Sequence, residues 1–166
     1  TSSGPGPFLI SIMENDQGQQ YLRYAGPFLP ASGAGIVSYL ENYPDIKYVE
    51  FFSPGGVLLE INAPGSAIRA AGIPFVVKQG EICVSACAFL ALYSEEIQID
   101  GAIAFHLPYL QGFPREASLF EISQSMVERT LRMSRHMFNN GWKLYLYLEI
   151  TRQTVNIENF LVFDDA

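Results

Sequence analysis

The order of short apolar segments along this chain predicts an α/β layer fold with a mostly parallel sheet and flanking helices. Strand-like runs such as 46–52, 74–78 and 102–106 alternate with helix-like stretches, which is typical of parallel strands joined by crossover helices. Apolar residues form 49% of the sequence and charged residues 16%, as in a globular chain. With 166 residues to build a core, we expect residues 8–166 to form a single domain. Residues 1–7 would be a flexible arm or an expression remnant.

The first elements predicted are a hairpin and a helix. Residues 8–12 and 19–24 are short apolar strands on either side of the turn-forming sequence Asn15-Asp16-Gln17-Gly18. A helix follows, which we expect Ser32 to cap and Pro44 to stop.

Strands and helices then alternate to the end of the chain. In order, we expect a strand over 46–52, a helical stretch over 57–71, a strand over 74–78, a helix over 85–94, strands over 97–99 and 102–106, helices over 116–139 and 142–150, and an apolar segment over 157–163. Pro64 lies within the second helical stretch, and we expect it to interrupt that helix.

Three segments together carry the components of nucleophilic catalysis. Ser85 lies among small residues in Cys83-Val84-Ser85-Ala86-Cys87, and Gly55-Gly56 ends the strand over 46–52. His106 follows the apolar run over 102–105. A hydroxyl that attacks a carbonyl needs a nearby base and backbone N–H donors for the oxyanion, and these segments could supply all three. Strand ends and helix starts are also where α/β folds place their chemistry.

Each feature taken alone has a plainer explanation. A serine at a helix start is commonly an N-cap, and a Pro-Gly-Gly sequence commonly makes a turn. A single histidine such as His106 is commonly a packed core or rim residue. The occurrence of all three in this order favours the catalytic interpretation, in which small neighbours allow a serine to occupy a sharp strand-to-helix turn. We expect no catalytic role for His136.

The two cysteines, Cys83 and Cys87, are too few for a disulfide framework and lack partners for a metal site. We favour two small buried packing residues beside the serine. A disulfide between them stays open as an alternative and would suit an oxidising compartment.

Charge and hydropathy exclude some classes of partner. The net charge is −7 and the ten basic residues are scattered, so we expect no nucleic-acid binding. No apolar run approaches the roughly 18–20 residues of a membrane helix, and no signal-like leader is present, so we expect no membrane span in this chain. A leader could have been removed from the mature protein.

The motifs resemble those of the Clp protease proteolytic-subunit (ClpP) family. Ser-Pro-Gly-Gly after a strand, Cys-x-Ser-x-Cys opening a helix and Phe-His after a strand carry the resemblance, which covers roughly residues 20–166. The match is nearest to the ClpP-like proteins of bacterial membrane and periplasmic systems. The resemblance implies a ClpP/crotonase-like spiral of ββα units. It also implies a periplasmic or membrane-associated protein; otherwise we expect a cytoplasmic one.

The resemblance further implies a serine peptidase that needs neither metal nor organic cofactor. Ser85 would be the nucleophile, His106 the general base, and the amides of Gly56 and Ala86 the oxyanion hole. Glu158, in Glu158-Asn159-Phe160-Leu161, occupies the place of the family's acid. The alternatives to it are Asp164, Asp165 or a catalytic dyad. The expected partners are a peptide or protein substrate and further copies of the chain in a homo-oligomer. No partner ATPase can be inferred.

Two other functions stay open. A crotonase-type enzyme would use paired amides to hold an acyl-CoA enolate and would need carboxylates in the cleft, for which Glu60 and Glu81 are the candidates. A catalytically degenerate ClpP-like subunit would assemble or bind peptides without cutting them.

Overall fold

The computed structural model describes residues 7–105 and 161–164. Its elements are β1 (Leu9–Glu14), β2 (Gln20–Ala25), α1 (Ser32–Asn42), β3 (Val49–Phe52), the 3-10 helix η1 (Leu58–Ile61), α2 (Asn62–Ala71), β4 (Phe75–Val77), β5 (Ile82–Val84), α3 (Ala86–Ala91), β6 (Ile97–Ile99), β7 (Ala102–Phe105) and β8 (Leu161–Asp164). The predicted helices over 116–139 and 142–150 lie outside the described residues, and the apolar segment over 157–163 ends in β8.

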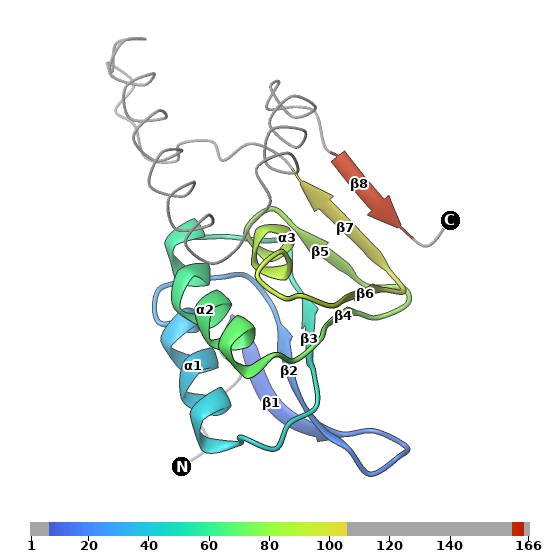
Figure 1. Cartoon of the computed structure of the whole chain (residues 1–166). Helices are drawn as coiled ribbons and strands as arrows, with labels where there is room; N and C mark the ends of the chain where they lie inside the picture. The colour runs from blue at the N-terminus through green and yellow to red at the C-terminus, as the bar shows by residue number, and fades with distance from the viewer. Residues whose placement is uncertain (1–6, 106–160, 165–166) are drawn as a thin grey trace, which may run out of the picture.

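The predicted α/β class and mostly parallel pairing are confirmed. A five-stranded sheet has the order β1-β2-β3-β4-β6, in which every pair is parallel except β1 with β2. A three-stranded sheet has the order β5-β7-β8, with β5 parallel and β8 antiparallel to β7. Helices α1 and α2 pack together beside the larger sheet, and α3 lies against β5 (Figure 1).

The chain alternates between the two sheets, and this alternation positions the site. It runs from β4 in the larger sheet to β5 in the smaller one, passes through α3, and repeats the step from β6 to β7. Two isolated parallel bridges, Phe28 with Gly56 and Ser53 with Cys83, extend the smaller sheet toward the segments that follow β2 and β3. The segments that follow β2 and β3 are therefore aligned side by side with β5.

A continuous apolar core lies between the larger sheet and its helices. Leu22, Val49 and Phe75 from successive parallel strands are completely buried, as are Ile36 of α1 and Ile68 of α2. Aromatic side chains run through this core in offset contact, namely Tyr24 with Phe28, Phe28 with Phe51, and Phe51 with Phe75. Such stacked pairs add to the stabilisation that burial alone provides.

The predicted hairpin is confirmed, and local polar chemistry explains it. The Asn15 side-chain oxygen accepts hydrogen bonds from the backbone N–H groups of Gln17 and Gln19, at 3.0 and 2.9 Å. Gly18 adopts a left-handed conformation with φ 74°. An asparagine that satisfies nearby backbone donors and a glycine at positive φ are the usual requirements of such a turn.

The expected cap of α1 by Ser32 is wrong. The helix begins at Ser32 itself after Ala31, whose φ is 74°, and no side chain of the N-cap residue makes a capping bond. The carboxylate of Glu60 instead accepts a hydrogen bond of 2.8 Å from the N–H of Gly33. A carboxylate at a helix N-terminus satisfies an unpaired donor and interacts favourably with the helix dipole. The end of the helix at Asn42, before Pro44, agrees with the prediction.

The expected interruption at Pro64 is also wrong. Helix α2 runs without a break from Asn62 to Ala71, and the distorted part is the preceding 3-10 helix. Pro64 is the third residue of α2, where the backbone N–H would have no partner within the helix in any case. The helix ends at Gly72, whose left-handed φ of 63° lets its N–H bond back to Ile68 and Arg69.

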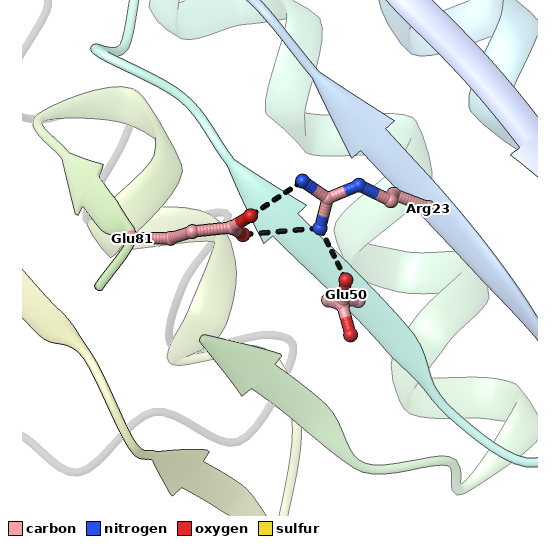
Figure 2. Close-up of polar contacts among 3 residues, drawn as sticks. All are labelled: Arg23, Glu50 and Glu81. Carbon is pink, nitrogen blue, oxygen red and sulfur yellow. Dashed lines mark hydrogen bonds and ion pairs between the residues drawn. The ribbon is translucent and has the colours of Figure 1, made fainter. Parts of the chain in front are cut away.

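An ion cluster of Arg23, Glu50 and Glu81 ties the two sheets together. Arg23 on β2 donates to Glu50 on β3 and, through both terminal nitrogens at 3.0 and 2.6 Å, to Glu81 just before β5 (Figure 2). The hydrogen bonds that Arg23 donates to Glu81 are the main reason that the pKa of Arg23 is raised above its usual value. A two-pronged guanidinium–carboxylate contact fixes direction as well as distance. The start of β5 is thereby held against the larger sheet.

No helix among residues 7–105 and 161–164 has the length and hydropathy needed to cross a membrane.

Candidate active site

Ser85 lies on a sharp turn between the end of β5 and the start of α3. Its backbone has φ 57° and ψ −118°, and Ala31 is the only other non-glycine residue at positive φ in the described part of the chain. An L-residue at positive φ costs of order 1–3 kcal/mol and persists only where surrounding contacts hold it there. Such a turn lifts a side chain out of the strand and away from the helix, which is the arrangement of an elbow-type nucleophile.

Backbone hydrogen bonds hold this turn, which we call the serine elbow (residues 83–87), on both sides. The Ser85 N–H donates to the carbonyl of Ala104 on β7 at 2.9 Å. The Ser85 carbonyl accepts from the N–H of Phe89 at 3.0 Å, which starts α3. Ser85 is half-buried, whereas Ala86 and the rest of α3 are buried completely. Ser85 thus lies at the edge of the core on a fixed backbone.

The diglycine turn approaches the serine elbow closely. A Cβ added to Gly55 would come within 2.7 Å of the Val84 carbonyl oxygen and 2.8 Å of the Ser85 Cβ. Real side chains do not make such contacts, so only glycine fits at this position, where φ is 98°. The two segments that the sequence analysis joined are therefore neighbours in space.

Gly56, the second glycine of the diglycine turn, makes an equally close contact with Phe28, on the side of the turn away from the serine elbow. Its backbone bridges Phe28: the Phe28 N–H donates to the Gly55 carbonyl, and the Val57 N–H donates to the Phe28 carbonyl, both at 2.8 Å. In a parallel bridge the bridging residue's own N–H points away from that partner. The Gly56 amide is therefore directed away from Phe28. The N–H of Ala86, the first residue of α3, has no acceptor within its own helix.

Ser53 has a structural role that the sequence did not reveal. Its side chain is fully buried, and its hydroxyl oxygen accepts a 3.1 Å hydrogen bond from the Gly55 N–H. Its backbone also pairs with the strand of the elbow, since Ser53 N–H donates to Ile82 and Ser53 carbonyl accepts from Val84. The sequence does contain a hint of this role, because Ser53 is the first residue of Ser-Pro-Gly-Gly. A serine hydroxyl two residues before a turn amide can accept a hydrogen bond from that amide. Ser53 fixes the diglycine turn beside Ser85.

Cys83 and Cys87 form a disulfide, which corrects the expectation of two separate packing residues. Both residues are fully buried, so the packing part of that expectation holds. Their Cα atoms are 5.2 Å apart, because the elbow folds the strand end back over the first turn of α3. That separation is typical of disulfides. No cysteine of the described residues is left free.

The remaining predicted residues, His106 and Glu158, lie outside the described residues. The neighbouring strand is informative, however. β7 is parallel to β5 with Val84 opposite Ala104, and it ends at Phe105, the residue before His106. The end of β7 is therefore beside the serine elbow.

The register of β8 bears on the alternative acid Asp164. Asp164 pairs with Ala102 at the start of β7, whereas Leu161 pairs with Phe105 at its end. Three residues of strand span about 10 Å. The backbone of Asp164 is thus at the end of β7 away from the serine elbow, which disfavours Asp164 as the acid of a triad. Asp165 is outside the described residues.

The two carboxylates considered for acyl-CoA chemistry both have structural partners. Glu60 accepts from the N–H of Gly33 at the start of α1, and Glu81 is bound to both terminal nitrogens of Arg23. A carboxylate held in this way is less free to act as a general base than an unpaired one. Among the described residues there is also no group of three or more His, Cys, Asp or Glu side chains that could hold a metal ion.

A polar groove of about 490 Å³ lies elsewhere on the molecule. Asn15 of the hairpin turn, Glu50 of the ion cluster and Gln98 of β6 are among its lining residues. Among the predicted site residues that the structure describes, neither Ser85, Gly56 nor Ala86 lines it. The groove therefore gives no support to the chemistry expected at Ser85.

The site rests on geometry and not on known relatives. A scan against protein-family models finds no family that matches this chain, and a search of curated proteins finds no match either.

Proposed function

We propose that this protein is a serine peptidase in which Ser85 attacks a peptide carbonyl and forms an acyl-enzyme. The observation that carries the proposal is the backbone of Ser85, which is held at φ 57° on a strand-to-helix turn directly against Gly55. Structural strain of this kind gathers at functional sites, because ordinary packing gives no reason to keep it. A serine needed only as a helix cap would not require positive φ.

In the proposed mechanism, His106 removes the hydroxyl proton of Ser85 and later gives it to the leaving amine. The amides of Gly56 and Ala86 hold the oxyanion of the tetrahedral intermediate, and water then hydrolyses the ester. The position of the end of β7 beside the serine elbow supports the first role. The orientation of the Gly56 amide away from Phe28 and the helix-terminal position of Ala86 support the second. Glu158 would orient the imidazole.

We also propose that the fold is a ClpP/crotonase-like spiral. Its mark would be a repeated ββα unit that contributes one strand to each of two sheets. The steps β4–β5–α3 and β6–β7 follow that pattern, and the bridges at Phe28 and Ser53 extend it toward the N-terminus. The buried disulfide supports an oxidising compartment, in agreement with the expected periplasmic location.

A fluorophosphonate probe tests the peptidase proposal, because it reacts only with an activated serine. We expect stoichiometric labelling that is lost in Ser85→Ala and reduced at least about 100-fold in His106→Ala, the usual size of a general-base contribution. Ser38→Ala, at an exposed serine of α1, and His136→Ala are the matched controls and should label normally. A folded wild-type chain that does not label would contradict the proposal and favour the degenerate subunit.

A further inference from the structure

We infer that the Cys83–Cys87 disulfide is a clamp on the nucleophile, so that reduction of this bond lowers the reactivity of Ser85. This inference rests on the proposed function of Ser85. The bond joins the residue two positions before Ser85 to the residue two positions after it. It therefore closes a loop of five residues with the strained serine at its centre.

The disulfide spans the turn that holds Ser85 at positive φ, which is the part of the elbow that needs a restraint. Cys83 belongs to β5, which is anchored by its pairing with β7, and Cys87 belongs to the first turn of α3. Apart from the bond, the turn between them is held by the backbone hydrogen bonds of Ser85 with Ala104 and Phe89 and of Val84 with Ser53, and by the close packing of Gly55. A residue at positive φ keeps that conformation only when its surroundings over-determine it. The disulfide is the covalent part of those surroundings.

Burial of the two sulfur-bearing residues gives the clamp a defined redox behaviour. Both cysteines are inaccessible to solvent in the folded chain, so a reductant must wait for the elbow to open. A dithiol then donates two electrons and two protons, the S–S bond breaks to give two thiols, and the dithiol is oxidised to its own disulfide. The clamp is therefore stable in an oxidising compartment and is lost where dithiol reductants are abundant.

The experiment compares oxidised protein, protein reduced with dithiothreitol until both thiols titrate, and the double variant Cys83→Ala/Cys87→Ala. We expect the maximal rate of fluorophosphonate labelling to fall about tenfold in the reduced chain and in the double variant. The concentration of probe that gives half the maximal rate should change little, because the clamp positions Ser85 without touching the probe. Reoxidation of the reduced chain should restore the rate.

A stability control separates positioning from general destabilisation. Ile36→Ala removes buried side-chain volume from α1, away from the elbow, and should destabilise the fold comparably. If Ile36→Ala slows labelling as much as loss of the disulfide, measured well below both melting temperatures, the clamp inference is wrong. It is equally wrong if the reduced chain and the double variant label at the wild-type rate.

Hydrogen exchange gives a readout that does not depend on catalysis. On reduction, the amides of Ser85 and Phe89 should exchange faster, while the amide of Val49, which donates to Pro74 in the larger sheet, should keep its rate. Equal acceleration at all three, or none, would overturn the clamp. If the oxidised chain never labels, the peptidase proposal fails, and this exchange pattern still decides whether the disulfide holds the elbow.

Discussion

Two tight turns in this protein both depend on glycine at positive φ, yet they serve different ends. The hairpin turn ends at Gly18, and a Cβ added there would meet nothing within 4 Å. The turn after β3 contains Gly56, where a Cβ would lie 2.2 Å from the Phe28 carbonyl oxygen. The first glycine only permits a backbone conformation. The second also permits the close approach of another chain segment.

The difference shows that a turn can tolerate substitution when it is held by its own residues, and cannot when other chain segments pack against it. The hairpin turn is held by Asn15, within the turn itself. The diglycine turn is held by two distant segments, Phe28 on one side and the serine elbow on the other, and also by the hydroxyl of the nearby Ser53. A turn with many distant partners can keep a strained neighbour such as Ser85 in place, and a self-contained turn cannot.

Gly56→Ala should have the largest effect. The added methyl group collides with backbone atoms of Phe28, which cannot move without separating the two segments. We expect a loss of at least about 4 kcal/mol in unfolding free energy, measured by urea denaturation. Fluorophosphonate labelling should be lost with it. A loss below about 1 kcal/mol would show that the two turns are equally tolerant.

Tyr24→Phe tests the contribution of Tyr24, which packs against Phe28 beside the diglycine turn, by its effect on the pH dependence of stability. The Tyr24 ring stacks on Phe28, and its hydroxyl donates to the Pro27 carbonyl at 2.6 Å. Burial raises the pKa of Tyr24 from 10.0 to about 12. Between these pH values the folded chain retains a proton that the unfolded chain has lost. This stabilising contribution is therefore fully present below pH 10 and is lost as the pH rises to about 12.

We expect up to about 3 kcal/mol of alkaline destabilisation from this group, as two pKa units imply. Tyr24→Phe should be less stable than wild type at pH 7, by about 1 kcal/mol for the lost hydrogen bond, but should lose less stability between pH 10 and 12. Urea titrations of both proteins at pH 7, 10 and 11.5 measure this. If the unfolding free energies of the two proteins fall in parallel with pH, the pKa of Tyr24 is not raised by burial.

Ser85→Gly should stabilise the protein by about 1 kcal/mol. Glycine adopts φ 57° without strain. The free energy gained by relieving the strain exceeds the cost of the greater conformational entropy that glycine gives the unfolded chain. Ser38→Gly is the matched control, because Ser38 lies exposed in the middle of α1 and should lose about 0.5 kcal/mol there. If both substitutions destabilise to the same extent, Ser85 is not strained. Thermal unfolding of the two variants makes the comparison.

Gly18→Ala should destabilise the protein far less than Gly56→Ala. The hairpin turn has room for a methyl group, so only the left-handed conformation of an L-residue costs energy, about 1 kcal/mol. Urea denaturation should show this small loss with unchanged labelling at Ser85. A loss comparable with that of Gly56→Ala would remove the distinction between the two turns.

The sequence predicted the elements whose causes are local. The hairpin, the end of α1 before Pro44 and the strand-to-helix turn at Ser85 follow from residues close together in the chain. The capping of α1 could not be predicted from nearby residues, because Glu60 lies 27 residues from Gly33 and no local pattern favours it over Ser32. The continuity of α2 through Pro64 depended on where the helix begins, which is the least predictable feature of a helix.

For the candidate site, the sequence identified Ser85 and the diglycine turn but not what fixes them. The buried hydroxyl of Ser53 and the Cys83–Cys87 bond depend on distances that only the folded chain sets. The roles of His106 and Glu158 stay predictions.

By itself, then, the sequence determined the α/β class and, within residues 8–105, the alternation of strands and helices apart from the short strand β5, because hydrophobic period and turn chemistry act over a few residues. It also singled out the segments at Ser85 and Gly55-Gly56, to which we assign the proposed chemistry. Tertiary structure alone decided which segments meet: Gly55 against Ser85, Gly56 against Phe28, and Arg23 between two carboxylates from different strands. Those contacts form only when strands distant in sequence align in the two sheets, and close packing then leaves no alternative position for the groups between them.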